Sequence, residues 1–153
     1  MIRLSDRPFT PPDALAEFER AAAGAGAIVS FTGLVRPHAE TGDVRVLHLQ
    51  AYSPMTENGI AQAMETAHRK WGLIAAHVIH RIGDMTPGEP IVFVATAAGH
   101  RRPAFEAADF LMDYLKTEAI FWKKEITASG THWIEPRTDD YRDRARWAEM
   151  EGN

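Results

Sequence analysis

Cysteine is absent from this chain of 153 residues. Its absence excludes disulfide bonds, thiolate metal ligands and cysteine nucleophiles. If the protein takes part in sulfur chemistry, the sulfur must therefore arrive on another molecule. The sequence also lacks the HExxH, GxSxG and GxGxxG motifs and the Walker phosphate loop, so the enzyme classes that those motifs mark are not indicated.

Long hydrophobic runs and an excess of positive charge are missing too. No apolar run reaches the length that a bilayer-spanning helix needs, and residues 1–8 lack the apolar core of a signal peptide. We therefore expect a cytoplasmic protein with no membrane partner. The net charge of −4 argues against a whole-protein basic surface of the kind that binds nucleic acid.

The hydrophobic content of 45% is enough to build the core of a single domain over residues 1–153. Capping residues and prolines predict helices that start at residues 10–13, at 53–54 and at 103. Runs rich in β-branched residues predict strands over residues 27–35, 44–52, 74–82, 90–98, 121–127 and 131–135. Paired strands between helices indicate an α+β fold with a mostly antiparallel sheet.

Two polar stretches stand apart from these elements. Residues 37–43 are expected to form a loop. Residues 138–153 mix both charges densely, and we interpret them either as a solvated helix or as a partly disordered, flexible tail.

The seven histidines raise the question of a metal site. His77 and His80 are three residues apart on a predicted strand, so their side chains point to opposite faces and cannot chelate one ion together. His80 is expected to be a core histidine. No other spacing matches a known ligand set, and we expect neither a metal site nor a cofactor.

A lysine pair, Lys116 and Lys123, lies on either side of the junction between a predicted helix and the aromatic start of a strand. Burial beside aromatic surface disfavours the ammonium form, so such a lysine can transfer protons or hold an anion. Strand alternation places Lys123 with Phe121 and Glu125 on one face and Lys124 on the other. Glu125 is expected to hold Lys123. The structural alternative is a lysine that suits the helix dipole, next to an ordinary aromatic core.

Two further clusters suit an anion. Gly33 to Arg36 lies at a strand end, where backbone N–H groups and a guanidinium can approach one ligand. His100 and Arg101 fall between a strand and a helix N-terminus, where free N–H groups and the helix dipole favour phosphate. The structural alternative in both places is a set of arginines that simply face water.

Taken together, these segments closely resemble the large, catalytic subunit of molybdopterin synthase. The resemblance runs from about residue 8 to residue 137. It rests on segments in a fixed order: FTGLVR at 31–36, HRIG at 80–83, HR at 100–101 followed by AFEA at 104–107, and MDYLKT at 112–117 running into FWKKE at 121–125.

The resemblance implies both a fold and an activity. The family has an α/β hammerhead fold with an additional antiparallel β subdomain. Its members convert cyclic pyranopterin monophosphate (precursor Z) into molybdopterin by installing two dithiolene sulfurs. The sulfur is carried as a thiocarboxylate on the C-terminal Gly-Gly of a small ubiquitin-like subunit. The large subunits form a homodimer within a heterotetramer.

The resemblance also implies the site residues. The catalytic lysines of the family fall on Lys116 and Lys123. Its substrate-binding residues fall on Leu34, Val35, Arg36, His100, Arg101, Lys116, Lys123, Lys124 and Glu125, with a further matching arginine at Arg137. The chain departs from the family pattern at Ile120, where proline usually precedes the Phe-Trp-Lys segment.

The mechanism that follows is a hypothesis. Arg36, His100 and Arg101 would hold the phosphate and the pterin, and Lys116 would transfer protons or stabilise charge on a thioester carbonyl. Lys123 would bind the carboxyl end of the tail. One alternative is a non-catalytic scaffold that binds a ubiquitin-like tail, and another is a metal-dependent phosphohydrolase that uses the histidines.

Overall fold

The computed structural model describes residues 1–151, and side chains up to residue 148. Within this range the chain forms four helices and nine strands in mixed order. The helices are α1 (Pro11–Ala21), α2 (Met55–Trp71), α3 (Arg101–Thr117) and α4 (Thr138–Glu151). The strands are β1 (Ile2–Ser5), β2 (Ala27–Leu34), β3 (His38–Ala39), β4 (Gly42–Ala51), β5 (Ala75–Arg81), β6 (Gly83–Met85), β7 (Pro90–Ala98), β8 (Phe121–Thr127) and β9 (Gly130–Ile134).

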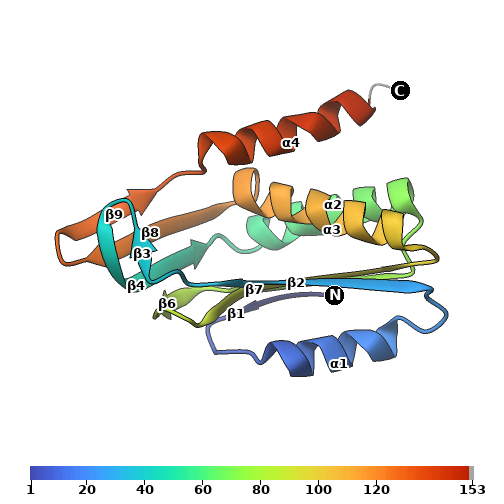
Figure 1. The fold of residues 1–153 in the computed structure, drawn as a ribbon, viewed down its shortest axis with the longest axis horizontal. Coiled ribbons are helices and arrows are strands. Elements are labelled where there is room, and N and C mark those ends of the chain that lie inside the picture. The colour runs from blue at the N-terminus through green and yellow to red at the C-terminus, as the bar shows by residue number, and fades with distance from the viewer. Residues whose placement is uncertain (152–153) are drawn as a thin grey trace.

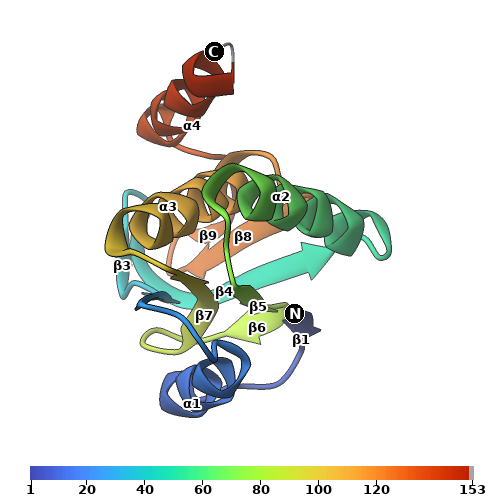
Figure 2. The ribbon, with the colours of Figure 1, turned by 90° about the vertical axis from the view of Figure 1, so that its right-hand side faces the viewer.

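A four-stranded sheet of order β1-β5-β7-β2 lies at the centre of the molecule. Helix α1 covers one face, and α2 and α3 cover the other (Figures 1 and 2). Phe18 of α1 packs with Ile79 and Phe93 on one side. Ile60 of α2 and Leu111 of α3 belong to the larger core cluster on the other side. Because β5 and β7 are covered on both faces, they are almost entirely buried.

A second, antiparallel sheet of order β3-β4-β8-β9 lies at one end of the first, with β6 also paired to β4 (Figure 1). Val35, Leu47, Leu49 and Met85 form its buried core. The predicted α+β class with an additional antiparallel β subdomain is therefore confirmed. This second sheet brings β8 alongside the carboxyl end of α3, and that junction carries both lysines.

The sequence missed three short strands. Strand β1 pairs in parallel with β5, β6 pairs with β4, and β3 forms a hairpin with β4 inside the expected 37–43 loop. Each has only two to four residues, too few to show a period. The hydrogen-bond partners of β1 and β6 also come from distant parts of the chain, so the tertiary structure decides these two strands.

Two helix starts differ from the prediction. Helix α3 begins at Arg101 with His100 at the N-cap position, two residues before the expected Pro103. Proline is tolerated at the third helical position because the first four N–H groups have no partner within the helix. Helix α2 begins at Met55, and the Ser53 hydroxyl donates to Glu57 (2.8 Å) rather than capping the backbone.

The segment predicted as a charged helix or flexible tail forms α4 as far as Glu151, and residues 152–153 lie outside the described part. Helix α4 packs on α3 (Figure 2). Trp147 is 4% exposed, and its indole N–H donates to Asp113 (2.6 Å). None of the described helices combines the length and the apolar character that a bilayer-crossing segment requires.

Candidate active site

Lys116 and Lys123 line one cavity of about 200 Å³. Lys116 lies in the last turn of α3, and Lys123 is the third residue of β8. The short link between these elements is held by Thr56 of α2, whose hydroxyl donates to the carbonyl of Ile120 (2.6 Å) and accepts from the Tyr52 N–H (2.9 Å). The predicted convergence of the two lysines is therefore present in the fold.

Thr56 provides a test of how this link is held. Thr56 is 1% exposed, so Thr56→Val leaves two polar backbone groups without their partner. We expect the free energy of unfolding to fall by about 1–3 kcal/mol, measured by urea denaturation. Thr56→Ser keeps the hydroxyl and should lose clearly less. A loss in Thr56→Ser together with no loss in Thr56→Val would show that packing of the methyl group, and not the hydrogen bonds, holds the link.

The pKa of Lys123 is lowered to about 8, mainly by desolvation and also by the positive charge of Lys116, while Asp140 opposes the shift. The pKa of Lys116 is also lowered. Desolvation is the main cause of its lowered pKa, Asp140 opposes it, and Arg36 and Arg137 add to it. Neutral amine is therefore more accessible at these two positions than at an ordinary surface lysine.

Two arginines connect this cavity to a larger one. Arg36 follows β2 and Arg137 follows β9, and both line the lysine cavity and a neighbouring cavity of about 560 Å³. Glu125 lines the larger cavity, and no ion pair joins it to Lys123 among the described residues, so the expected Glu125–Lys123 contact is not formed. The pair of guanidinium groups suits a phosphate or carboxylate ligand.

A small cavity of about 80 Å³ lies on the other side of the lysines. Its apolar walls include Phe31, Leu34 and Met112. His80 also lines it and is 3% exposed. Desolvation lowers the pKa of His80 to about 3, and its ring stacks on Phe121 with centroids 4.2 Å apart. His80 is therefore a neutral core histidine, as predicted, and adds no charge beside the lysines.

The segment that carries Leu34 and Arg36 is held by backbone pairing. The β2–β7 ladder is irregular between Gly33 and Leu34, and a Cβ at Gly33 would lie 2.8 Å from Val92 Cγ1. Val35 is 3% exposed and lines none of the cavities described above. Its N–H donates to the Glu89 carbonyl (2.9 Å), and its carbonyl accepts from Gly88 (2.8 Å). Val35 is a core residue that positions Arg36.

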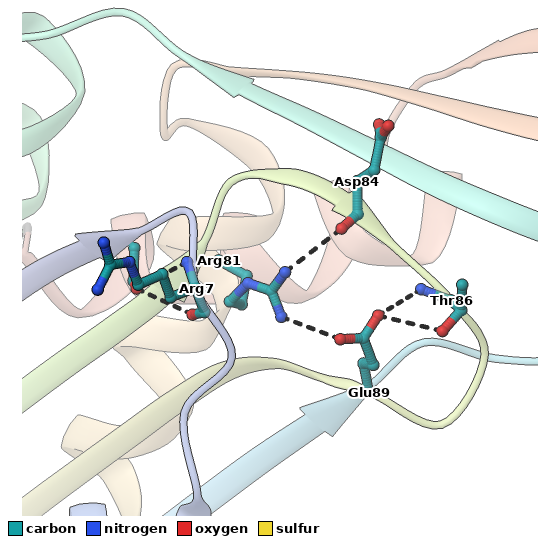
Figure 3. A network of polar contacts seen from close by, with 6 residues as sticks. Arg7, Arg81, Asp84, Thr86 and Glu89 are labelled. Carbon is teal, nitrogen blue, oxygen red and sulfur yellow. Dashed lines mark hydrogen bonds and ion pairs between the residues drawn. The ribbon is translucent and has the colours of Figure 1, made fainter.

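A polar network fixes the turn that pairs with Val35 (Figure 3). Arg81 is 3% exposed and donates to the Glu89 carboxylate (3.3 Å) and to the Asp84 carbonyl (3.3 Å). The same carboxylate accepts from the backbone N–H of Thr86 (2.6 Å). These contacts explain the arginine of the HRIG segment structurally, since it supports the site without lining the cavities described above.

Besides Val35, three further predicted site residues lie away from the lysine cavity. Lys124 points to the other face of β8, with its Nζ 5.8 Å from the centre of the Trp133 ring. His100 and Arg101 are exposed at the start of α3. Lys116 is fifteen residues further along the same helix, about 22 Å away at 1.5 Å per residue. One chain therefore does not bring His100 and Arg101 to its own lysines.

Sequence reasoning missed Asp140 and Tyr141 of α4, which also line the lysine cavity. Both lie in the densely charged segment, where no local pattern distinguishes a residue that faces a cavity from one that faces water. Among the described residues, no group of three or more His, Asp or Glu side chains is arranged to hold a metal ion.

Comparison with known proteins agrees with this arrangement. The family model described as MoaE protein matches residues 4–118. A protein of Caulobacter vibrioides named molybdopterin synthase catalytic subunit is 46% identical over 96% of this chain and 97% of its own length. The protein of the same name from Cereibacter sphaeroides is 52% identical over 85% of this chain and 88% of its own length.

A solved structure gives the same result for the fold. The molybdopterin biosynthesis MoaE protein from Burkholderia ambifaria superposes with a TM-score of 0.82 at 37% identity, covering 97% of both chains. The family model ends at residue 118, just after Lys116, whereas the Caulobacter relative and the solved structure each cover nearly all of this chain. The chain belongs to the MoaE protein family.

Proposed function

We propose that this chain is the catalytic subunit of a molybdopterin synthase. It would transfer sulfur from the thiocarboxylated C-terminal Gly-Gly of a small ubiquitin-like subunit to cyclic pyranopterin monophosphate, forming the dithiolene of molybdopterin. The observation that carries this proposal is the pair of desolvated lysines in one small cavity flanked by two arginines. The absence of cysteine agrees with sulfur delivered by a partner.

The chemistry divides between the two lysines. In each of two transfers, a thiocarboxylate sulfur forms a bond to a side-chain carbon of the pterin while a carbon–oxygen bond at that carbon breaks. The oxygen leaves as a phosphate oxygen or as water, and a thioester then links the tail to the pterin. Water then cleaves the thioester, so the sulfur stays on the pterin and the tail departs as a carboxylate. Lys116 moves protons or stabilises the charge on the thioester oxygen. Lys123 holds the carboxyl end of the tail.

The anionic substrate would be held by guanidinium groups from two chains. Arg36 and Arg137 flank the lysines in the same chain. His100 and Arg101 lie at the far end of α3, so a second copy of the chain would have to supply them. This fits the homodimer within a heterotetramer that the family resemblance implies. The sequence prediction of a cytoplasmic location stays a prediction.

The test is reconstitution from purified components. Mixing the chain with precursor Z and thiocarboxylated small subunit should produce dithiolene, followed as its oxidised fluorescent derivative. Omitting either component should remove the signal. Small-subunit binding without product would favour the scaffold alternative, and loss of both binding and product would contradict the proposal.

A further inference from the structure

Asp140 in the first turn of α4 is the less exposed of the two carboxylates in the lysine cavity. Its side chain is 13% exposed, whereas Glu135 is an exposed residue. The Asp140 carboxylate accepts from the backbone N–H of Arg137 (2.9 Å) and pairs with the Arg137 guanidinium (3.6 Å). The backbone contact is one half of a capping box, in which an acid at the third helical position binds the N-cap N–H.

The cavity holds more positive than negative groups, so the Asp140 carboxylate has a large effect on its electrostatics. The charged groups that line it are Arg36, Lys116, Lys123, Glu135, Arg137 and Asp140. Four cations therefore face two anions, and Asp140 is the anion that raises the pKa of both lysines. Tyr141 adds a phenol next to it on the same helix. Without Asp140, the cation cluster would repel itself more strongly.

Hydrogen bonds and an ion pair between α4 and α3 fix the position of Asp140 relative to α3. Asp113 of α3 accepts from the Trp147 indole N–H (2.6 Å) and from Arg146 (3.0 Å). Arg144 pairs with Glu118 at the end of α3 (2.6 Å). Since Lys116 lies between Asp113 and Glu118 in the sequence, the same contacts position the Asp140 carboxylate against the lysine end of α3.

We propose that Asp140 is a positioning residue of the sulfur-transfer site: it orients Arg137 and supplies a largely buried negative charge in the cavity that Lys116 and Lys123 line. The functional half of this proposal rests on the proposed synthase activity. Asp140 touches neither the sulfur nor the pterin in this scheme, and acts through the three cations around it.

The decisive variant is Asp140→Asn, which keeps the size of the side chain and an oxygen that can accept the Arg137 N–H. Removing only the charge should lower the pKa of both lysines by about 0.5–1 unit. Competitive acylation of the purified chain across a pH series, read by peptide mass spectrometry, measures each lysine separately. This readout needs no turnover, so it tests Asp140 even if the synthase assay fails.

The matched control is Asp139→Asn. Asp139 is 61% exposed and pairs with Arg142, so its loss changes the net charge equally while leaving the cavity intact. We expect its lysine pKa values to stay within about 0.2 units of the unaltered protein. Unchanged values in Asp140→Asn, or equal shifts in both variants, would overturn the proposal.

Turnover provides the second readout. The pH–rate profile has a limb that reports the titration of the lysines. In Asp140→Asn this limb should move to lower pH by about 0.5–1 unit, the same shift that is expected for the pKa values measured by acylation. Asp140→Glu, which restores the charge, should move it back. If Asp140→Asn does not fold, Asp140→Ser serves instead, because its hydroxyl also accepts the Arg137 N–H. A limb that moves in none of the charge-removing variants would contradict the functional half.

Discussion

Lys116→Ala is expected to lower dithiolene formation by about 10²–10⁴-fold, the range typical of a lost proton-transfer group. Lys116 lines the cavity with Lys123, and its lowered pKa makes the neutral amine more accessible than in an ordinary surface lysine. No ion pair involving Lys116 is formed among the described residues. The variant should therefore fold normally and still bind the small subunit.

The measurement is single-turnover formation of the fluorescent product derivative, with small-subunit binding recorded in parallel. Arg69→Ala is a suitable control, because Arg69 is exposed in the last turn of α2 and lines none of the cavities described above. Its turnover should match that of the unaltered protein. Turnover of Lys116→Ala within a few-fold of the control would remove Lys116 from the mechanism.

Mixed dimers of Lys116→Ala and Arg101→Ala chains are expected to regain activity that neither variant has alone. If Arg101 of one copy serves the lysines of the other, a mixed dimer has one doubly altered site and one intact site. Random pairing makes about half of the dimers mixed, so about a quarter of the normal activity should return. The physical reason is the length of α3, about 22 Å between Arg101 and Lys116 at 1.5 Å per residue.

The two variants would be co-expressed with different affinity tags, so that mixed dimers are purified and assayed directly. These pure mixed dimers should show about half of the normal activity, since one of two sites is intact. Mixed dimers of Lys116→Ala with Lys123→Ala are the matched control. Both residues line the same cavity, so both sites of that dimer are damaged. Restoration in neither combination would mean that His100 and Arg101 do not complete the partner's site.

Much of the architecture follows from local sequence pattern. The helix over residues 101–117 has a continuous apolar stripe, and the hairpin of β8 and β9 has its glycine at the turn, so both are predicted to within two residues. Strand alternation correctly separates Lys123 from Lys124 and His77 from His80. The short strands β1 and β6 were missed because their pairing partners lie far away in the chain, and β3 was missed because it has only two residues.

The sequence by itself determined the residue types of the site: two lysines beside an aromatic strand start, arginines after β2 and β9, and no sulfur nucleophile. Only the tertiary structure decided which of them meet. It separated His100 and Arg101 from the lysines by the length of one helix, buried Val35, and brought Asp140 into the cavity by docking α4 through Asp113 and Trp147. Docking and burial depend on contacts between distant segments, and the local periodicity of apolar residues does not indicate those contacts.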